Sequence, residues 1–117
     1  MQYMLLVYEP EKAYADEAGR AKLMEIVGGH MKLAAQLRET GVWVNGDGLQ
    51  GVATATTVVT GAGGVQTLHD GPFAETPEML GGYYLIDVPD LDAALGWARR
   101  VPVVEGGKIE VRPIMTY

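Results

Sequence analysis

The residues best suited to acid–base chemistry in this chain are one histidine and two acids that lie far apart in the sequence. His30 falls within an apolar helical pattern, whereas Asp70 begins the stretch Asp-Gly-Pro-Phe and Glu75 follows it. A histidine titrates near neutral pH and can act as a general base, and a neighbouring carboxylate can fix its tautomer. We therefore predict that His30, Asp70 and Glu75 form a catalytic site for proton transfer on a small polar or aromatic molecule.

His30 has two interpretations. Ile26, Leu33 and Leu37 share its helical face, so the ring is expected to point toward a sheet. In the first interpretation His30 is a core residue whose polar atoms are satisfied by a backbone carbonyl or by a hydroxyl such as that of Tyr8. In the second, it is a general base that faces a cavity.

The segment around Asp-Gly-Pro-Phe also has two interpretations. Asp70 can accept a backbone N–H two residues on, and Gly71 can adopt a positive φ, which explains a plain turn. Phe73 and Glu75 on such a loop are instead typical of a pocket rim. We predict both roles, with residues 73–81 spanning the open end of the site. The predicted substrate-binding side chains are Phe73, Tyr83 and Tyr8.

Other site chemistries have little support. A metal would need His30 and His69 together with an acid, but no spacing of a known metal motif is present. We predict no metal and no cofactor. The chain has no cysteine, which excludes thiolate ligands and disulfides.

Composition limits the partners further. The 117 residues predict a single domain, 1–117. Nine Lys and Arg against 15 Asp and Glu give a net charge of −6, which argues against nucleic-acid binding. The apolar runs are too short for a membrane span, and the first residues do not have the pattern of a secretory signal. We therefore expect a cytoplasmic protein with no membrane partner.

Hydrophobic patterns predict the elements that must position these residues. The expected strands are 3–8, 42–44, 83–88 and 108–115, with a hairpin formed by 54–60 and 65–69. Asn45-Gly46-Asp47-Gly48 predicts a turn. One helix is expected from about residue 20 to Thr40, ended by Gly41, and a second begins at the N-cap Asp90.

This order, β-α-β, hairpin, β-α-β, predicts a ferredoxin-like α+β fold. Two helices can cover only one face of the sheet. The strands 3–8 and 83–88 are apolar at nearly every position, so the other face must also be covered. We predict that a second copy covers it, in a homodimer joined through the sheet face.

Motifs along the whole chain resemble the DGPF-domain proteins of the YCII-related superfamily. These motifs are MLLVYE, GVWVNGDGLQGVATATTV, DGPFAET, GGYYLIDVPDLDAALGWARRVP and IEVRPIMTY. The resemblance implies a dimeric α/β barrel, in which two ferredoxin-like protomers pack sheet to sheet. It also implies a largely unestablished function. Some members look like small enzymes built around a His and an Asp, and many are encoded beside extracytoplasmic-function sigma factors.

Two positions can be compared with the superfamily one by one. His30, eleven residues before Gly41, matches its suspected catalytic histidine. Pro77 stands where relatives commonly have a lysine, which argues against an anion-binding side chain there. Two hypotheses follow. The protein is a small enzyme or ligand-binding protein with a His/Asp acid–base pocket at the open end of the barrel, or it is a non-catalytic accessory module associated with a sigma factor.

Overall fold

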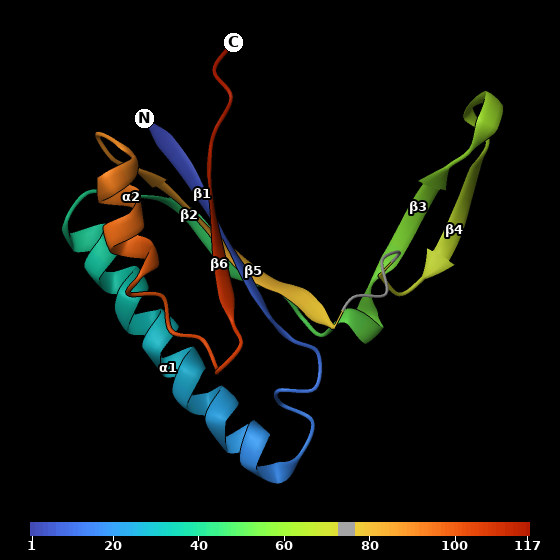
Figure 1. Cartoon of the computed structure of the whole chain (residues 1–117), viewed down its shortest axis with the longest axis horizontal. Coiled ribbons are helices and arrows are strands. Elements are labelled where there is room, and N and C mark those ends of the chain that lie inside the picture. The colour runs from blue at the N-terminus through green and yellow to red at the C-terminus, as the bar shows by residue number, and fades with distance from the viewer. Residues whose placement is uncertain (73–76) are drawn as a thin grey trace.

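A computed structural model describes residues 1–72 and 77–117 of the chain. Four antiparallel strands form the main sheet, in the order β2-β5-β1-β6. Their bounds are Gln2–Pro10 for β1, Trp43–Gly48 for β2, Glu78–Asp87 for β5 and Lys108–Pro113 for β6. Two helices, α1 (Glu17–Glu39) and α2 (Leu91–Ala98), lie on the same side of this sheet (Figure 1). This α+β arrangement is compatible with the predicted ferredoxin-like fold.

The core lies between the sheet and the helices. Alternate side chains of a strand point to the same face, so Tyr3, Leu5 and Val7 of β1 all face the helices and are buried. In the register of β1 with β5, Leu5 pairs with Tyr84 and Tyr3 pairs with Ile86. The largest fully buried side chains are Leu5, Leu37 and Ile86.

Both helices begin at an aspartate N-cap, and α1 ends just before a glycine. The Asp16 carboxylate accepts from the backbone N–H of Gly19 at 2.6 Å, and the Asp90 carboxylate accepts from that of Ala93 at 2.9 Å. Helix α1 ends before Gly41, which has a φ of +78°. The predicted stop at Gly41 and the predicted N-cap at Asp90 are confirmed.

The predicted turn at Asn45-Gly46-Asp47-Gly48 is wrong, because these residues continue β2. They pair with β5 from Asn45 opposite Leu85 to Gly48 opposite Gly82, after a register shift that follows Trp43. Gly46 serves close packing, because a Cβ there would lie 3.0 Å from both the Trp43 ring and the Tyr83 carbonyl oxygen. It is needed inside the sheet and not for a reversal of the chain.

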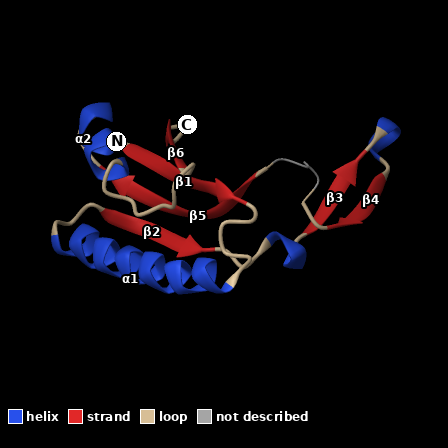
Figure 2. Ribbon diagram, turned by 60° about the horizontal axis from the view of Figure 1, so that its bottom comes forward, coloured by secondary structure: helices blue, strands red, loops and turns tan. Residues whose placement is uncertain are grey.

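The predicted hairpin forms a sheet of its own. Strand β3 (Thr56–Thr60) pairs with β4 (Gln66–Asp70), with a short 3-10 turn between them. Figure 2 shows this pair of strands set apart from the four-stranded sheet. Asp70 lies opposite Thr56 at the end of β4, and the next residue, Gly71, has the predicted positive φ, +95°.

The face of the main sheet opposite the helices is apolar at its centre. Met4, Leu6 and Tyr8 of β1 and Leu85 of β5 point to this face and are only half-buried in a single chain. This agrees with the pattern on which the predicted homodimer depends. Within the part of the chain that the structure describes, neither helix has the length and apolarity needed to cross a membrane.

Candidate functional site

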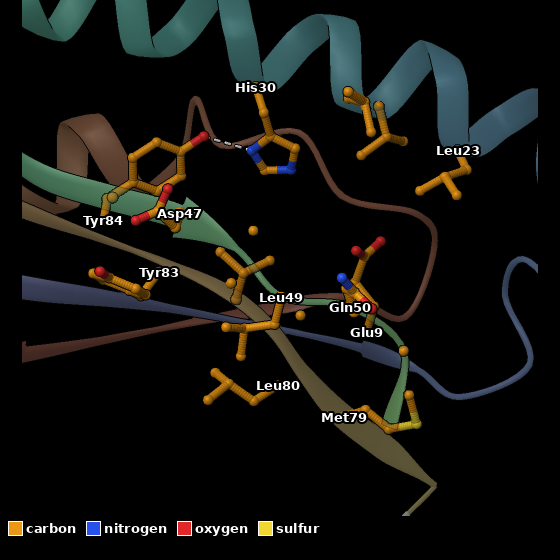
Figure 3. Close-up of a pocket in the computed structure, with 18 of the residues that line it drawn as sticks. Glu9, Leu23, His30, Asp47, Leu49, Gln50, Met79, Leu80, Tyr83 and Tyr84 are labelled. Atoms are coloured by element: carbon orange, nitrogen blue, oxygen red, sulfur yellow. Dashed lines mark hydrogen bonds between the residues drawn. The ribbon is translucent and has the colours of Figure 1, made fainter. Parts of the chain in front are cut away.

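A cavity of about 720 Å³ opens between α1 and the β1, β2 and β5 strands (Figure 3). This volume lies in the usual range for small-molecule sites. Apolar side chains from α1 and the strands form much of its wall, among them Leu23, Ile26, Val7 and Leu80. The polar and charged side chains on the wall are His30, Tyr84, Glu9, Glu11, Asp47, Arg38, Tyr14, Tyr83 and Gln50.

His30 and Tyr84 are in direct contact on this wall. The Nδ1 atom of His30 lies 2.5 Å from the Tyr84 hydroxyl oxygen, and the two rings stack with centroids 5.8 Å apart. Tyr84 is buried, with 6% of its surface exposed, so its O–H needs an acceptor. Donation to Nδ1 places the proton of the neutral imidazole on Nε2. Figure 3 shows this second nitrogen turned away from Tyr84, toward the open space.

The pKa values of the pair agree with this assignment. Burial lowers the pKa of His30 below its usual 6.5, against the opposing effects of the Glu9 carboxylate and the Pro102 backbone carbonyl. The ring is therefore neutral at pH 7. Burial raises the pKa of Tyr84 to about 12, so the phenol keeps its proton. His30 accordingly presents an Nε2–H donor to the cavity.

Glu9 supplies the carboxylate of this site. It continues the row of helix-facing side chains in β1, two residues after Val7. One carboxylate oxygen, Oε2, accepts from the Tyr14 hydroxyl and from the Val104 backbone N–H, the latter at 3.1 Å. Burial, together with Glu9, raises the pKa of the Tyr14 phenol, which keeps it a donor. The other oxygen, Oε1, has no hydrogen-bond partner among residues 1–72 and 77–117.

The comparison with known proteins now places the chain in a family. Residues 1–117 match the YCII-related domain. The chain belongs to the YCII-related family. An uncharacterised protein of Rhizobium meliloti (strain 1021) is 44% identical over 66 residues, which are 55% of this chain and 53% of that relative. The match thus spans about half the length of the relative, and the predicted superfamily is confirmed.

Two of the predicted tyrosines differ in their surroundings in this YCII-related chain. Tyr83 borders the cavity, but it pairs with Leu6, so its side chain points to the sheet face away from the helices, where its hydroxyl accepts from the Asn45 side-chain amide at 3.2 Å. Tyr8 points to that same face, where it lines a smaller hollow with Lys108 and Glu110. The expectation that the Tyr8 hydroxyl forms a hydrogen bond with His30 is therefore wrong, because Tyr8 and α1 lie on opposite sides of the sheet. Tyr84 makes the contact instead.

The structure does not bring Asp70 to His30 within one chain. Asp70 is exposed at the end of β4 and does not line the cavity, since β3 and β4 form a separate sheet. Glu9 is the carboxylate that acts on the His30 ring. A catalytic role for Asp70 stays a prediction. Phe73 and Glu75 lie outside the described residues.

Sequence reasoning missed Glu9 and Arg38 as members of the site, and it chose Tyr83 where the neighbouring Tyr84 contacts His30. A signal for Glu9 was present: it extends the period-two row Tyr3, Leu5 and Val7, which places a charged group at the end of a buried face. Among the residues that the structure describes, no three His, Asp or Glu side chains gather closely enough to hold a metal ion.

Proposed function

We propose that this protein is a small acid–base enzyme, which binds a flat organic molecule in the cavity and moves a proton beside a carbonyl or phenolic oxygen. One observation carries the proposal: the neutral His30 ring, held through Nδ1 by Tyr84, shares a cavity wall with a carboxylate held by two donors. Fixed groups of this kind are suited to proton transfer, since they need little rearrangement during the reaction.

The proton transfer needs no co-reactant. Nε2–H of His30 donates a hydrogen bond to the carbonyl oxygen of the bound molecule. Oε1 of Glu9 takes a proton from the neighbouring carbon, and the electron pair of that C–H bond moves toward the oxygen. The resulting enolate is stabilised by the Nε2–H donor. Return of the proton from Glu9 to the same or another carbon restores a neutral product and the starting carboxylate.

The accessory-module hypothesis is the less favoured alternative. A protein that only contacts a sigma factor has no need of an open space beside His30, and a filled core there would suit it as well. The cavity on this side of α1 supports the enzyme or ligand-binding hypothesis instead. A stoichiometric complex recovered with a sigma factor would reverse this preference.

We also propose that the protein works as a homodimer, joined through the sheet face that carries Met4, Leu6 and Leu85. Half-buried apolar side chains at the centre of a sheet support this assembly, because their burial against a second copy removes apolar surface from water. His30 on α1 and Glu9, in the helix-facing row of β1, both lie on the helix side of the sheet, so each protomer keeps its own pair.

The test uses acetophenone, a neutral ring compound whose methyl protons exchange with solvent through the enol. Exchange in D₂O is followed by proton NMR, with and without protein. We expect the protein to accelerate exchange, His30→Gln to lower the rate, and Glu9→Gln to abolish the acceleration. Glu25→Gln is the control, because Glu25 is an exposed α1 residue paired with Lys22. Exchange that is no faster than in buffer would contradict the proposed chemistry.

A further inference from the structure

Arg38 lies on the same face of α1 as His30. His30, Ala34 and Arg38 are spaced four residues apart, and all three line the cavity. Eight residues of helix span about 12 Å, and a long helical side chain leans back toward the N-terminus. The Arg38 guanidinium can therefore face the same bound molecule as the His30 ring, from the opposite end.

A row of aromatic rings connects these two ends. The Arg38 guanidinium carbon lies 4.3 Å from the centroid of the Trp43 ring. Trp43 in turn meets Tyr84 edge to face, with centroids 6.3 Å apart and planes at 81°. Tyr84 holds His30. A flat molecule lying along this row would have one end at the acid–base pair and the other at Arg38.

The charge of Arg38 has no acidic partner among the residues that the structure describes. Within residues 1–72 and 77–117 its guanidinium forms no ion pair, although acids outnumber bases in the chain, 15 to 9. The other charged side chains on the cavity wall are Glu9, Glu11 and Asp47, which are all acids. Among the described residues of the wall, an anionic group on a ligand would be repelled by these acids and attracted at Arg38 alone.

The chemistry of the guanidinium also selects the kind of anion. Its carbon lies over the Trp43 ring, and its N–H groups make no hydrogen bond within residues 1–72 and 77–117. The planar N–H edge of an arginine can donate two parallel hydrogen bonds, a geometry that matches the two oxygens of a carboxylate.

Arg100 provides an internal comparison. Its guanidinium also lies 4.3 Å from the centroid of a tryptophan ring, that of Trp97. Unlike Arg38, it donates to the Gln36 side-chain oxygen and does not line the cavity. An Arg–Trp contact alone therefore does not mark a ligand site. Arg38 differs from Arg100 because it lies on the cavity wall and has no ion-pair partner in the described part of the chain.

We infer that the ligand of this cavity is a flat carboxylic acid, with its carboxylate on Arg38 and its carbonyl or hydroxyl group at His30 and Glu9. The assignment of the reacting end rests on the proposed function, whereas the assignment of the carboxylate end rests on Arg38, Trp43 and the charge of the wall.

The test compares two probes that differ only in charge, 4-acetylbenzoate and 4-acetylbenzamide. Each is titrated by calorimetry into the wild type, Arg38→Gln, Arg38→Lys and Arg100→Gln, with thermal unfolding as a check of the fold. We expect the wild type and Arg100→Gln to bind the acid about tenfold more tightly than the amide, since a charge-assisted contact contributes about 1.5 kcal/mol. Arg38→Gln should bind both equally, and Arg38→Lys should keep part of the preference.

The outcomes separate the two proposals. Equal binding of acid and amide to the wild type, or an unchanged preference in Arg38→Gln, would overturn the carboxylate inference and leave the proposed function standing. Failure of both probes to shift the NMR signals of His30 and Trp43 would contradict a ligand cavity altogether, and with it both proposals. Added salt should weaken the preference for the acid, because Arg38 is exposed.

Discussion

The Nδ1 atom of His30 and the hydroxyl oxygen of Tyr84 are 2.5 Å apart, although the two residues are 54 positions apart in the chain. The contact joins the middle of α1 to β5 across the wall of the cavity. It decides the chemistry of His30, because a phenol that keeps its proton donates to Nδ1 and leaves Nε2–H for a ligand. Tyr84 is thus a positioning residue, which acts through the histidine.

Tyr84→Phe should raise the pKa of His30. The Tyr84 O–H donates to the neutral ring, and its removal takes away part of what favours that form. The free energy of unfolding should fall by about 1 kcal/mol with the lost hydrogen bond. Titration of the His30 Hε1 signal by NMR measures the pKa shift. Tyr83→Phe is the matched control, because the Tyr83 hydroxyl contacts Asn45 and not His30.

Glu9→Gln should shift the same signal in the opposite direction. The Glu9 carboxylate raises the pKa of His30, so replacing it with a neutral amide should lower that pKa further. If the pKa of His30 fell in Tyr84→Phe, or rose in Glu9→Gln, the assignment of these two residues as partners of His30 would be contradicted.

The depressed pKa of His30 predicts how stability depends on pH. Well above pH 6.5 the ring is neutral in both the folded and the unfolded chain, so its titration does not lower the free energy of unfolding there. As the pH falls below 6.5, the unfolded chain binds a proton that the folded chain does not yet bind, so stability decreases. Urea unfolding measured at a series of pH values from 7.5 to 5 should therefore show a smaller loss of stability in His30→Gln than in the wild type. His69→Gln keeps His30 and should keep that larger loss.

The fold could be predicted because its signals are local. The signals are the nearly continuous apolar runs of β1 and β5, the caps at Asp90 and Gly41, and the β-branched runs of the hairpin, and each depends on residues close in sequence. The exception is β2, where Asn45 to Gly48 have the composition of a turn. There the pairing with β5, which is remote in sequence, overrides the local preference.

The site was harder to predict, because it depends on which remote residues meet. Tyr83 and Tyr84 are neighbours in one strand and so point to opposite faces, but only the packing of α1 against β5 decides which of them reaches His30. Asp70 precedes β5 closely in sequence, which suggested a place near the histidine. The hairpin forms a second sheet, however, and carries Asp70 away from the cavity.

Two neighbouring glycines of α1 should respond differently to alanine. A Cβ on Gly28 would meet nothing within 4 Å, so Gly28→Ala should raise the free energy of unfolding by about 1 kcal/mol through helix propensity alone. A Cβ on Gly29 would lie 3.0 Å from Cγ and 3.2 Å from Cβ of Pro102, which should cancel that gain. Urea denaturation of both variants checks this. Equal gains would mean that Gly29 is not needed for the approach of Pro102.

Leu6→Lys should convert the proposed homodimer to a monomer. Leu6 points to the open face of the sheet, with Tyr83 and Glu110 as its neighbours on the flanking strands. In a monomer the new ammonium can reach water or pair with Glu110, so the fold should survive. In a dimer each copy would bury that charge, and we expect the dissociation constant to rise by about 100-fold or more.

Sedimentation velocity at micromolar concentration measures this assembly directly. The wild type should sediment with twice the 12.6 kDa mass of the chain, and Leu6→Lys with that mass once. Met24→Glu is the control, because Met24 is 78% exposed on α1, outside the sheet face, and should leave the dimer intact. A wild type that sediments as a monomer would contradict the homodimer. If Met24→Glu alone dissociated it, the interface would involve the helices, and the open sheet face would need another partner.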